Sequence, residues 1–188
     1  MKINARTVQV AAVLTLAVAV AAAAGAAQWR SDRENEMKSF QTETIAKTLR
    51  FADAAEPGEV IVDNLFGPIK VEGHPGREVV LEAKKIVYAR DEARARQAEK
   101  EVKLDITEKG NTIEAYVDGP FRDDEKERRE RGIRMDRDPG YRVYYGFTLK
   151  VPARTDLVLS TVLDGDVEVR GVEGAFDVRN VVGRVRLI

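Results

Sequence analysis

Three glycine-centred stretches of the chain repeat one pattern of alternating residues. They read VDNLFGPIKVEG at residues 62–73, STVLDGDVEVRG at 160–171 and VRNVVGRVRLI at 178–188. In each stretch the central glycine is followed by a short strand pattern, x-apolar-x-apolar. The last two glycines lie about 18 residues apart, a spacing typical of one coil of a β-solenoid.

Glycine and asparagine mark the corners of this repeat. Both residues tolerate left-handed backbone conformations, which a chain needs where it turns sharply between strands. The pattern assigns structural roles to the asparagines that lie three residues before a central glycine, to the central glycines, and to the glycines six residues after them. These residues are Asn64, Gly67, Gly73, Gly165, Gly171, Asn180 and Gly183.

The remaining body is also mostly β in pattern. Residues 102–117 alternate on both sides of a Gly110-Asn111 turn, which predicts a hairpin. Residues 143–151 form the clearest alternating strand and are followed by Pro152. Residues 89–101 lack β-branched side chains and favour one short surface helix.

The first residues predict export. Lys2 and Arg6 precede an uncharged, alanine-rich run, so residues 1–29 are expected to be a signal peptide or a transmembrane anchor formed by an apolar helix. The chain has 31 basic and 32 acidic residues, and this balance gives no indication of a nucleic-acid partner. It has no cysteine, which excludes disulfides and thiolate chemistry.

The expected domain organisation follows from these segments. Residues 30–50 are polar and are predicted to be a tether or a short surface helix. Residues 51–188 are predicted to be a mainly β, solenoid-like or right-handed β-helix-like domain. Residues 121–142 carry interleaved charges of both signs and are expected to be a solvated, charged insertion.

The order of motifs resembles the bacterial β-strand-repeat family labelled putative adhesin, a family of unknown function. The resemblance covers about residues 51–188 and is carried by GPIKVEG at 67–73, Val151-Pro152 and residues 159–174. It implies an N-terminal signal or membrane segment and a β-helix-like body, and it brings no catalytic residues. Members continue through further coils, so an end at Ile188 predicts a truncated copy or an edge that something else covers.

Candidate chemistry is sparse. Asp164 and Asp166 flank Gly165 and are weak candidates for a calcium site, because the other two copies have no carboxylates at these positions. Turn geometry explains them without a metal. His74 is the only histidine and lies in a Gly/Pro turn, where no catalytic triad pattern surrounds it.

We therefore expect a non-enzymatic cell-envelope protein without a cofactor, exported and either membrane-anchored or periplasmic or extracellular. Its role would be binding, adhesion or scaffolding, with an envelope protein or a polysaccharide as partner. The alternatives are a carbohydrate-active β-helix enzyme, with Asp166, Glu168, Arg170, Arg184 and Arg186 forming a charged face, or an accessory component of an envelope-stress or signalling system. The sequence indicates no particular oligomeric state.

Overall fold

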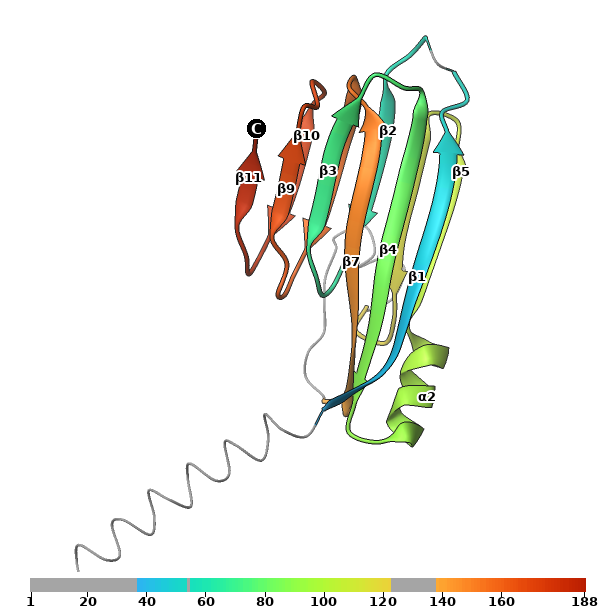
Figure 1. The fold of residues 1–188 in the computed structure, drawn as a ribbon, viewed down its shortest axis with the longest axis vertical. Helices are drawn as coiled ribbons and strands as arrows, with labels where there is room; N and C mark the ends of the chain where they lie inside the picture. The colour runs from blue at the N-terminus through green and yellow to red at the C-terminus, as the bar shows by residue number, and fades with distance from the viewer. Residues whose placement is uncertain (1–36, 54, 123–137) are drawn as a thin grey trace, which may run out of the picture. The chain divides into compact units, whose positions relative to one another are not determined.

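The protein is described by a computed structural model that covers residues 37–53, 55–122 and 138–188. Residues 38–188 form one compact unit of two mixed β-sheets and one helix (Figure 1). Sheet A has the strand order β1 (Lys38–Arg50), β4 (Glu78–Ala89), β7 (Tyr141–Pro152), β3 (Ile69–His74), β9 (Val167–Arg170), β11 (Val185–Leu187). Sheet B has the order β10 (Phe176–Asn180), β8 (Thr155–Thr161), β2 (Gly58–Asp63), β6 (Thr112–Asp118), β5 (Lys103–Lys109).

Each of the three repeated stretches forms one layer that spans both sheets. Layer 1 is β2 and β3, layer 2 is β8 and β9, and layer 3 is β10 and β11. The first strand of each layer lies in sheet B and the second in sheet A, with parallel pairing between successive layers. The alternation read from the sequence therefore corresponds to a real stack of strands.

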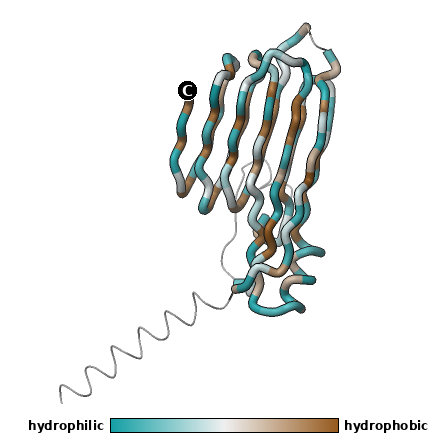
Figure 2. The backbone as a smooth tube through the Cα atoms, in the orientation of Figure 1, coloured by the Kyte–Doolittle hydropathy of each residue, from teal (hydrophilic) through white to brown (hydrophobic). Residues whose placement is uncertain are grey.

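The core lies between the two sheets and is built mainly from alternate residues of β2, β3, β4, β6, β7, β8 and β9. Val60, Ile69, Leu149, Leu159 and Val167 are all essentially inaccessible to water. Figure 2 shows the alternation of hydrophobic and hydrophilic residues along the strands. Period-two alternation places one set of side chains inside and the other in solvent, which is why the layers stack with their apolar residues in register.

Antiparallel strands and a helix complete the unit beside the layers. β4 pairs with both β1 and β7, and β5 and β6 form the expected hairpin through Gly110. Helix α2 (Glu92–Glu101) begins at Asp91, whose side chain accepts a hydrogen bond from the Arg94 N–H and so caps the helix. The short surface helix is confirmed.

The expected tether is wrong for residues 38–50, which form β1 and pair with β4 along its length. Leu49 is buried in the core, and the compact unit begins at Lys38 rather than at residue 51. The polar composition of this segment does not indicate a tether, because an edge strand needs few apolar side chains. Backbone hydrogen bonds hold such a strand, and most of its side chains face water. Residues 30–36 lie outside the described residues.

The expected charged insertion is shorter than residues 121–142. Phe121 and Arg122 at one end and Tyr141 at the other are packed into the fold, and Arg142 belongs to β7. Residues 123–137 lie outside the described residues, as does the expected signal or anchor at 1–29. Among the residues that the structure describes, no helix is long and apolar enough to cross a membrane.

The fold class is thus mainly β with one short helix, as expected. The architecture is two mixed sheets, in which parallel layers occupy one side and antiparallel strands the other. The uniform solenoid or right-handed β-helix that the sequence predicts is not observed, because antiparallel strands flank the stacked layers. β4 runs antiparallel to β1 and β7, and β5 runs antiparallel to β6, whereas a simple coil contains no such reversals.

Candidate functional site

The repeated central glycines lie where successive layers approach most closely. A Cβ atom on Gly67 would lie 2.3 Å from the carbonyl oxygen of Tyr145. A Cβ on Gly165 would lie 2.2 Å from the carbonyl oxygen of Gly67, and one on Gly183 would lie 2.2 Å from that of Gly165. Each distance is too short for a real side chain, so stacking itself requires glycine here.

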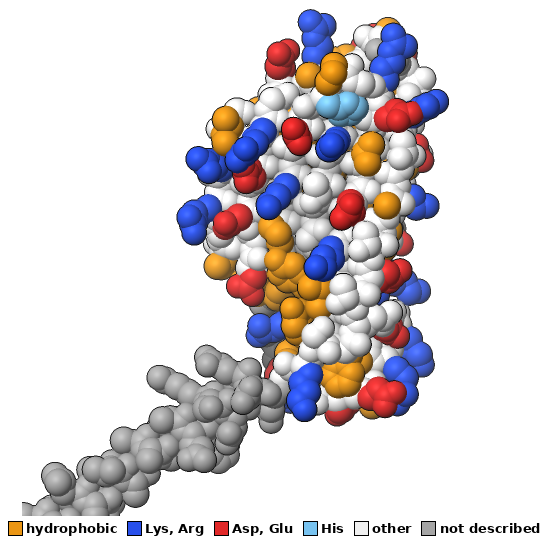
Figure 3. Space-filling view, viewed as in Figure 1, with side chains coloured by type: hydrophobic (Ala, Val, Ile, Leu, Met, Phe, Trp, Pro, Cys, Tyr) orange, Lys and Arg blue, Asp and Glu red, His pale blue; other side chains and the backbone are white. Residues whose placement is uncertain are grey.

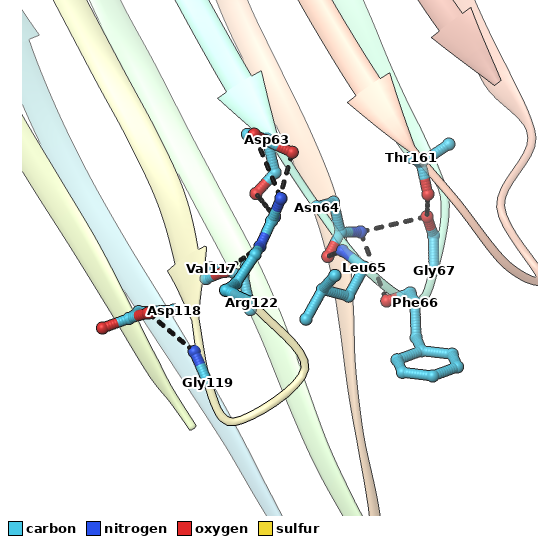
Figure 4. A network of polar contacts seen from close by, with 10 residues as sticks. All are labelled: Asp63, Asn64, Leu65, Phe66, Gly67, Val117, Asp118, Gly119, Arg122 and Thr161. Atoms are coloured by element: carbon cyan, nitrogen blue, oxygen red, sulfur yellow. Dashed lines mark hydrogen bonds and ion pairs between the residues drawn. The ribbon is translucent and has the colours of Figure 1, made fainter. Parts of the chain in front are cut away.

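A column of polar side chains runs beside these glycines, and Figure 4 shows two of its members, Asn64 and Thr161, at Gly67. Asn64 is fully buried, and its Nδ2 donates to the carbonyl oxygens of Phe66, Gly67 and Tyr145. In layer 2 the hydroxyl of Thr161 donates to the Gly67 carbonyl, and in layer 3 the Nδ2 of Asn180 donates to the Gly165 carbonyl. The column supplies hydrogen-bond donors to carbonyls at the tight corner, of which the Phe66 carbonyl also accepts from the Tyr145 N–H.

Aligning the sequence on glycine does not identify the layer 2 member of this column. That alignment places Val162 opposite the asparagines, whereas the strand register pairs Thr161 with Asn180. Layer 2 contains one extra residue between the strand and the central glycine. Asp164 occupies the added space with a φ of 52°, in the left-handed region.

The two candidate metal ligands have separate structural roles. Asp164 lies in the left-handed corner, and Asp166 Oδ1 accepts a hydrogen bond from the Arg184 N–H at 2.8 Å. Asp166 therefore links layer 2 to layer 3. Within the described ranges, no three metal-ligating side chains come together.

The second pair of repeated glycines also meets across layers. A Cβ on Gly73 would lie 1.8 Å from the carbonyl oxygen of Gly171, and Gly171 itself has a φ of 62°. The Gly171 N–H donates in turn to the carbonyl of Ile188. This pair is consequently structural and marks the opposite corner of the layers.

A buried ion pair that the sequence does not reveal lies beside the column (Figure 4). The Arg122 guanidinium donates to both carboxylate oxygens of Asp63 and to the backbone carbonyl of Val117, and it lies 4.8 Å from the ring centroid of Tyr116. The two side chains of the pair are only 6% and 5% exposed. This contact fixes the chain just before residue 123 to β2, a pairing between residues 59 positions apart that has no local signal.

A hollow of about 850 Å³ lies where three turns meet at one end of the sheets. The turns lead into β2, from β3 to β4 and from β7 to β8. Arg77 and Arg154 are exposed on its rim, and neither makes an ion pair in the part of the chain that the structure describes. Arg50 and Glu78 form an exposed ion pair at the same rim, which raises the pKa of the Arg50 guanidinium.

His74 lines this hollow but both of its ring nitrogens are engaged. Nε2 lies 2.8 Å from the Glu78 carbonyl oxygen, and Nδ1 accepts a hydrogen bond from the Gly76 N–H at 3.0 Å. The acceptor role of Nδ1 requires the neutral tautomer with the proton on Nε2. His74 thus holds the β3–β4 turn, as its Gly/Pro context indicates.

Buried tyrosines show the largest perturbations among the titrating groups. Burial raises the pKa of Tyr145, and burial together with a hydrogen bond to Glu101 raises that of Tyr141. The same hydrogen bond lowers the pKa of Glu101. Burial also raises the pKa of Tyr144. These hydroxyls are held neutral, and the Tyr141–Glu101 bond ties β7 to the end of α2.

The outward face of sheet A carries the charges that suggested a catalytic face. Side chains of both signs are interspersed over it (Figure 3). Glu168 forms an ion pair with Arg170, and in the strand register it lies between Lys70 and Arg186. Opposite charges are therefore neighbours across these strands, an arrangement that stabilises the sheet and keeps its face soluble.

Three solved structures are weakly similar to this chain. A putative cell adhesion protein from Clostridium sporogenes is 10% identical, with a TM-score of 0.36, and the match covers 78% of this chain and 68% of that one. Putative adhesins from Parabacteroides distasonis and Bacteroides fragilis are 11% and 8% identical, with TM-scores of 0.29 and 0.28. Those two matches cover 77% of this chain and only 56% and 61% of the neighbours' own length.

No family model and no curated protein matches the chain. Since the TM-scores lie below 0.5, function has to be argued from the residues of this chain.

Proposed function

We propose that this protein is a non-enzymatic binding domain of the bacterial cell envelope, exported through its N-terminal segment and either released or retained on the membrane. The stacked layers, a short solenoid-like body beside antiparallel strands, serve as a rigid support for the turns at their ends. Rigid strands that present loops are a common way to hold a recognition surface.

The hollow at the turns is the proposed contact surface, and its ligand is an acidic polysaccharide. The single observation that carries this assignment is the pair of exposed guanidiniums, Arg77 and Arg154, which line the hollow without an ion pair among the described residues. Guanidinium groups bind carboxylates and sulfates in a planar, two-pronged geometry. Phe51 lines the same hollow and offers an aromatic surface to a sugar ring.

Binding without turnover is supported by the state of the candidate catalytic groups. Both nitrogens of His74 contact backbone atoms, Asp166 accepts a backbone hydrogen bond from Arg184, and Glu168 is paired with Arg170. A glycoside hydrolase requires two carboxyl groups that face each other across a bound sugar. Here the carboxylates of Asp166 and Glu168 instead make contacts with Arg184 and Arg170 of the same domain.

Binding is tested with the full-length chain and two polymers, polygalacturonate and neutral dextran. We expect polygalacturonate alone to bind, and the double change Arg77→Ala/Arg154→Ala to weaken binding at least tenfold. Arg96→Ala/Arg142→Ala removes the same charge from exposed positions outside the hollow and should leave affinity unchanged. Equal binding of dextran, or release of new reducing ends from either polymer, would overturn the proposal.

The proposed export is tested separately by determining the mature N-terminus in a bacterial host. Retention of residues 1–29 in the membrane fraction indicates an anchor, whereas their loss from an extracytoplasmic product indicates a cleaved signal. Recovery of the intact chain from the cytoplasm alone would contradict export in either form.

A further inference from the structure

The hollow at the three turns is apolar over much of its lining. Each of the turns contributes one proline, and the other apolar side chains are a phenylalanine and two alanines. These residues are Phe51, Ala55, Pro57, Pro75, Pro152 and Ala153. Pro57 and Pro75 are exposed, and Phe51 is half-buried. A ligand in the hollow therefore meets apolar surface as well as the arginines of the rim.

This apolar lining is held in place by the fold. A Cβ added to Gly58 would lie 2.3 Å from the Cε2 atom of Phe51, so the Phe51 ring packs directly on the backbone of Gly58. The prolines have a fixed φ angle, which restricts the conformations of the turns that carry them. The lining is thus formed before a ligand arrives, and binding loses little conformational entropy there.

Backbone groups of the same turns are engaged within the protein. The Glu56 carbonyl accepts a hydrogen bond from a side chain of the β5–β6 turn. In the β3–β4 turn the side chain of His74 contacts both the Gly76 N–H and the Glu78 carbonyl. The Ala153 N–H donates to the backbone carbonyl of His74. Since proline has no N–H, the guanidiniums are the main donors that the hollow offers to a ligand.

A lining of this kind favours some sugars over others. A hydroxyl that is pressed against proline or phenylalanine loses its hydrogen bonds to water and gains none in return, which costs free energy. An acyl ester on that hydroxyl removes the donor and adds a methyl group, whose burial is favourable. The hollow therefore matches a polymer that combines negative charge with short apolar substituents.

We propose that the acidic polysaccharide bound in the hollow carries short acyl esters, of which acetyl is the smallest. Its carboxylates contact Arg77 and Arg154, and its acyl groups pack against Phe51 and the prolines. The volume of about 850 Å³ is within the range of sites for small molecules and holds a short stretch of substituted chain. This inference rests on the proposed function, because it specifies the ligand of the same hollow.

The test compares O-acetylated polygalacturonate with the same preparation after mild alkaline removal of its esters. Both polymers carry the same carboxylates, so they differ in the acyl groups alone. Each is titrated against the full-length chain by calorimetry, and we expect the acetylated polymer to bind about fivefold more tightly or better. Added salt should weaken both polymers and leave their ratio unchanged, because screening acts on the charges and not on the apolar contact.

The double change Pro57→Ser/Pro75→Ser tests where the acyl groups bind. It replaces two exposed prolines of the lining by small polar residues, and the variant should bind the two polymers equally. Circular dichroism checks that the variant is folded. Pro120→Ser changes an exposed proline outside the hollow and is the matched control, which should keep the preference for the acetylated polymer.

The outcomes separate this inference from the proposed function. Equal binding of the two polymers by the unchanged chain would overturn the acyl preference and leave the binding of acidic polysaccharide intact. Binding of neither polymer would overturn both. A preference that the double proline variant retains would also overturn the inference, because the acyl groups would then contact another part of the protein.

Discussion

The two sides of the sheets, one bounded by β1 and β5 and the other by β10 and β11, are built differently. At one end, β1 and β5 place charged residues on the core-facing side of the outermost strand: Glu43 and Lys47 on β1, and Glu108 opposite Ile113 on β5. At the other end, β10 and β11 place Phe176, Val185 and Leu187 on that side, each at least 39% exposed. Inward charges at an edge discourage the addition of a further strand, whereas exposed apolar residues favour it.

The difference separates a half of the sheets with a buried ion pair from a half with an exposed one. The protected half contains the buried Asp63–Arg122 pair and the full set of hydrogen bonds from Asn64. The open half repeats the same residue types closer to solvent. Asp177 and Arg179 form an exposed pair on β10, and Asn180 in the polar column is partly buried. Matched substitutions at the two ends can therefore measure how much burial contributes.

The largest expected difference is between two arginine–aspartate pairs. Arg122→Ala leaves Asp63 buried without its partner and should lower the free energy of unfolding by about 3–5 kcal/mol. Arg179→Ala breaks a pair whose side chains are 56% and 49% exposed and should cost at most about 0.5–1 kcal/mol. Urea denaturation followed by circular dichroism measures both.

A double change separates pairing from packing in this comparison. Asp63→Leu/Arg122→Leu removes both buried charges and should recover much of the loss, because an apolar pair of similar volume is often as stable. Equal costs for Arg122→Ala and Arg179→Ala would show that burial is not what distinguishes the two ends.

The next difference concerns the central glycines. Gly67→Ala places a Cβ against the Tyr145 carbonyl at a φ of 117° and should cost about 2–4 kcal/mol. Gly183→Ala makes an equally short contact in layer 3, where nothing packs on the far side in the described sheets. That layer can move outward, so we expect about half the cost.

Gly110→Ala is the control for backbone conformation alone. Gly110 has a φ of 60° and open space around the site of a Cβ, so alanine should cost about 1 kcal/mol. Thermal or urea unfolding of the three variants ranks them. A cost for Gly67→Ala no larger than that for Gly110→Ala would mean that the close approach between layers is not limiting.

The sequence predicted what is local and periodic. Alternation located the layers, the Gly110-Asn111 turn located the hairpin, and the central glycines were assigned the corners that they occupy. The β1 strand could not be predicted, because an edge strand lacks the alternating apolar residues on which the prediction of strands depends. The extra residue in layer 2 could not be predicted, because an alignment on the central glycines does not show where an inserted residue lies.

The contact surfaces were less predictable than the strands. The hollow joins residues from three turns that are far apart in the chain, and the Asp63–Arg122 pair joins β2 to a distant segment. These contacts between distant parts of the chain depend on the strand order, which an alternation of apolar and polar residues does not specify.

The smallest expected difference is between the two asparagines of the polar column. Asn64→Ala removes three donated hydrogen bonds and one accepted from the Leu65 N–H, all in the fully buried interior, and should cost about 2–3 kcal/mol.

Asn180→Ala removes one bond, to the Gly165 carbonyl. The Oδ1 of Asn180 is also the only buried side-chain nitrogen or oxygen in the described residues without a hydrogen-bond partner, so its removal relieves a desolvation cost. The net loss should stay below about 1 kcal/mol by urea denaturation. A loss for Asn180→Ala as large as that for Asn64→Ala would instead mean that layer 3 is as tightly held as layer 1.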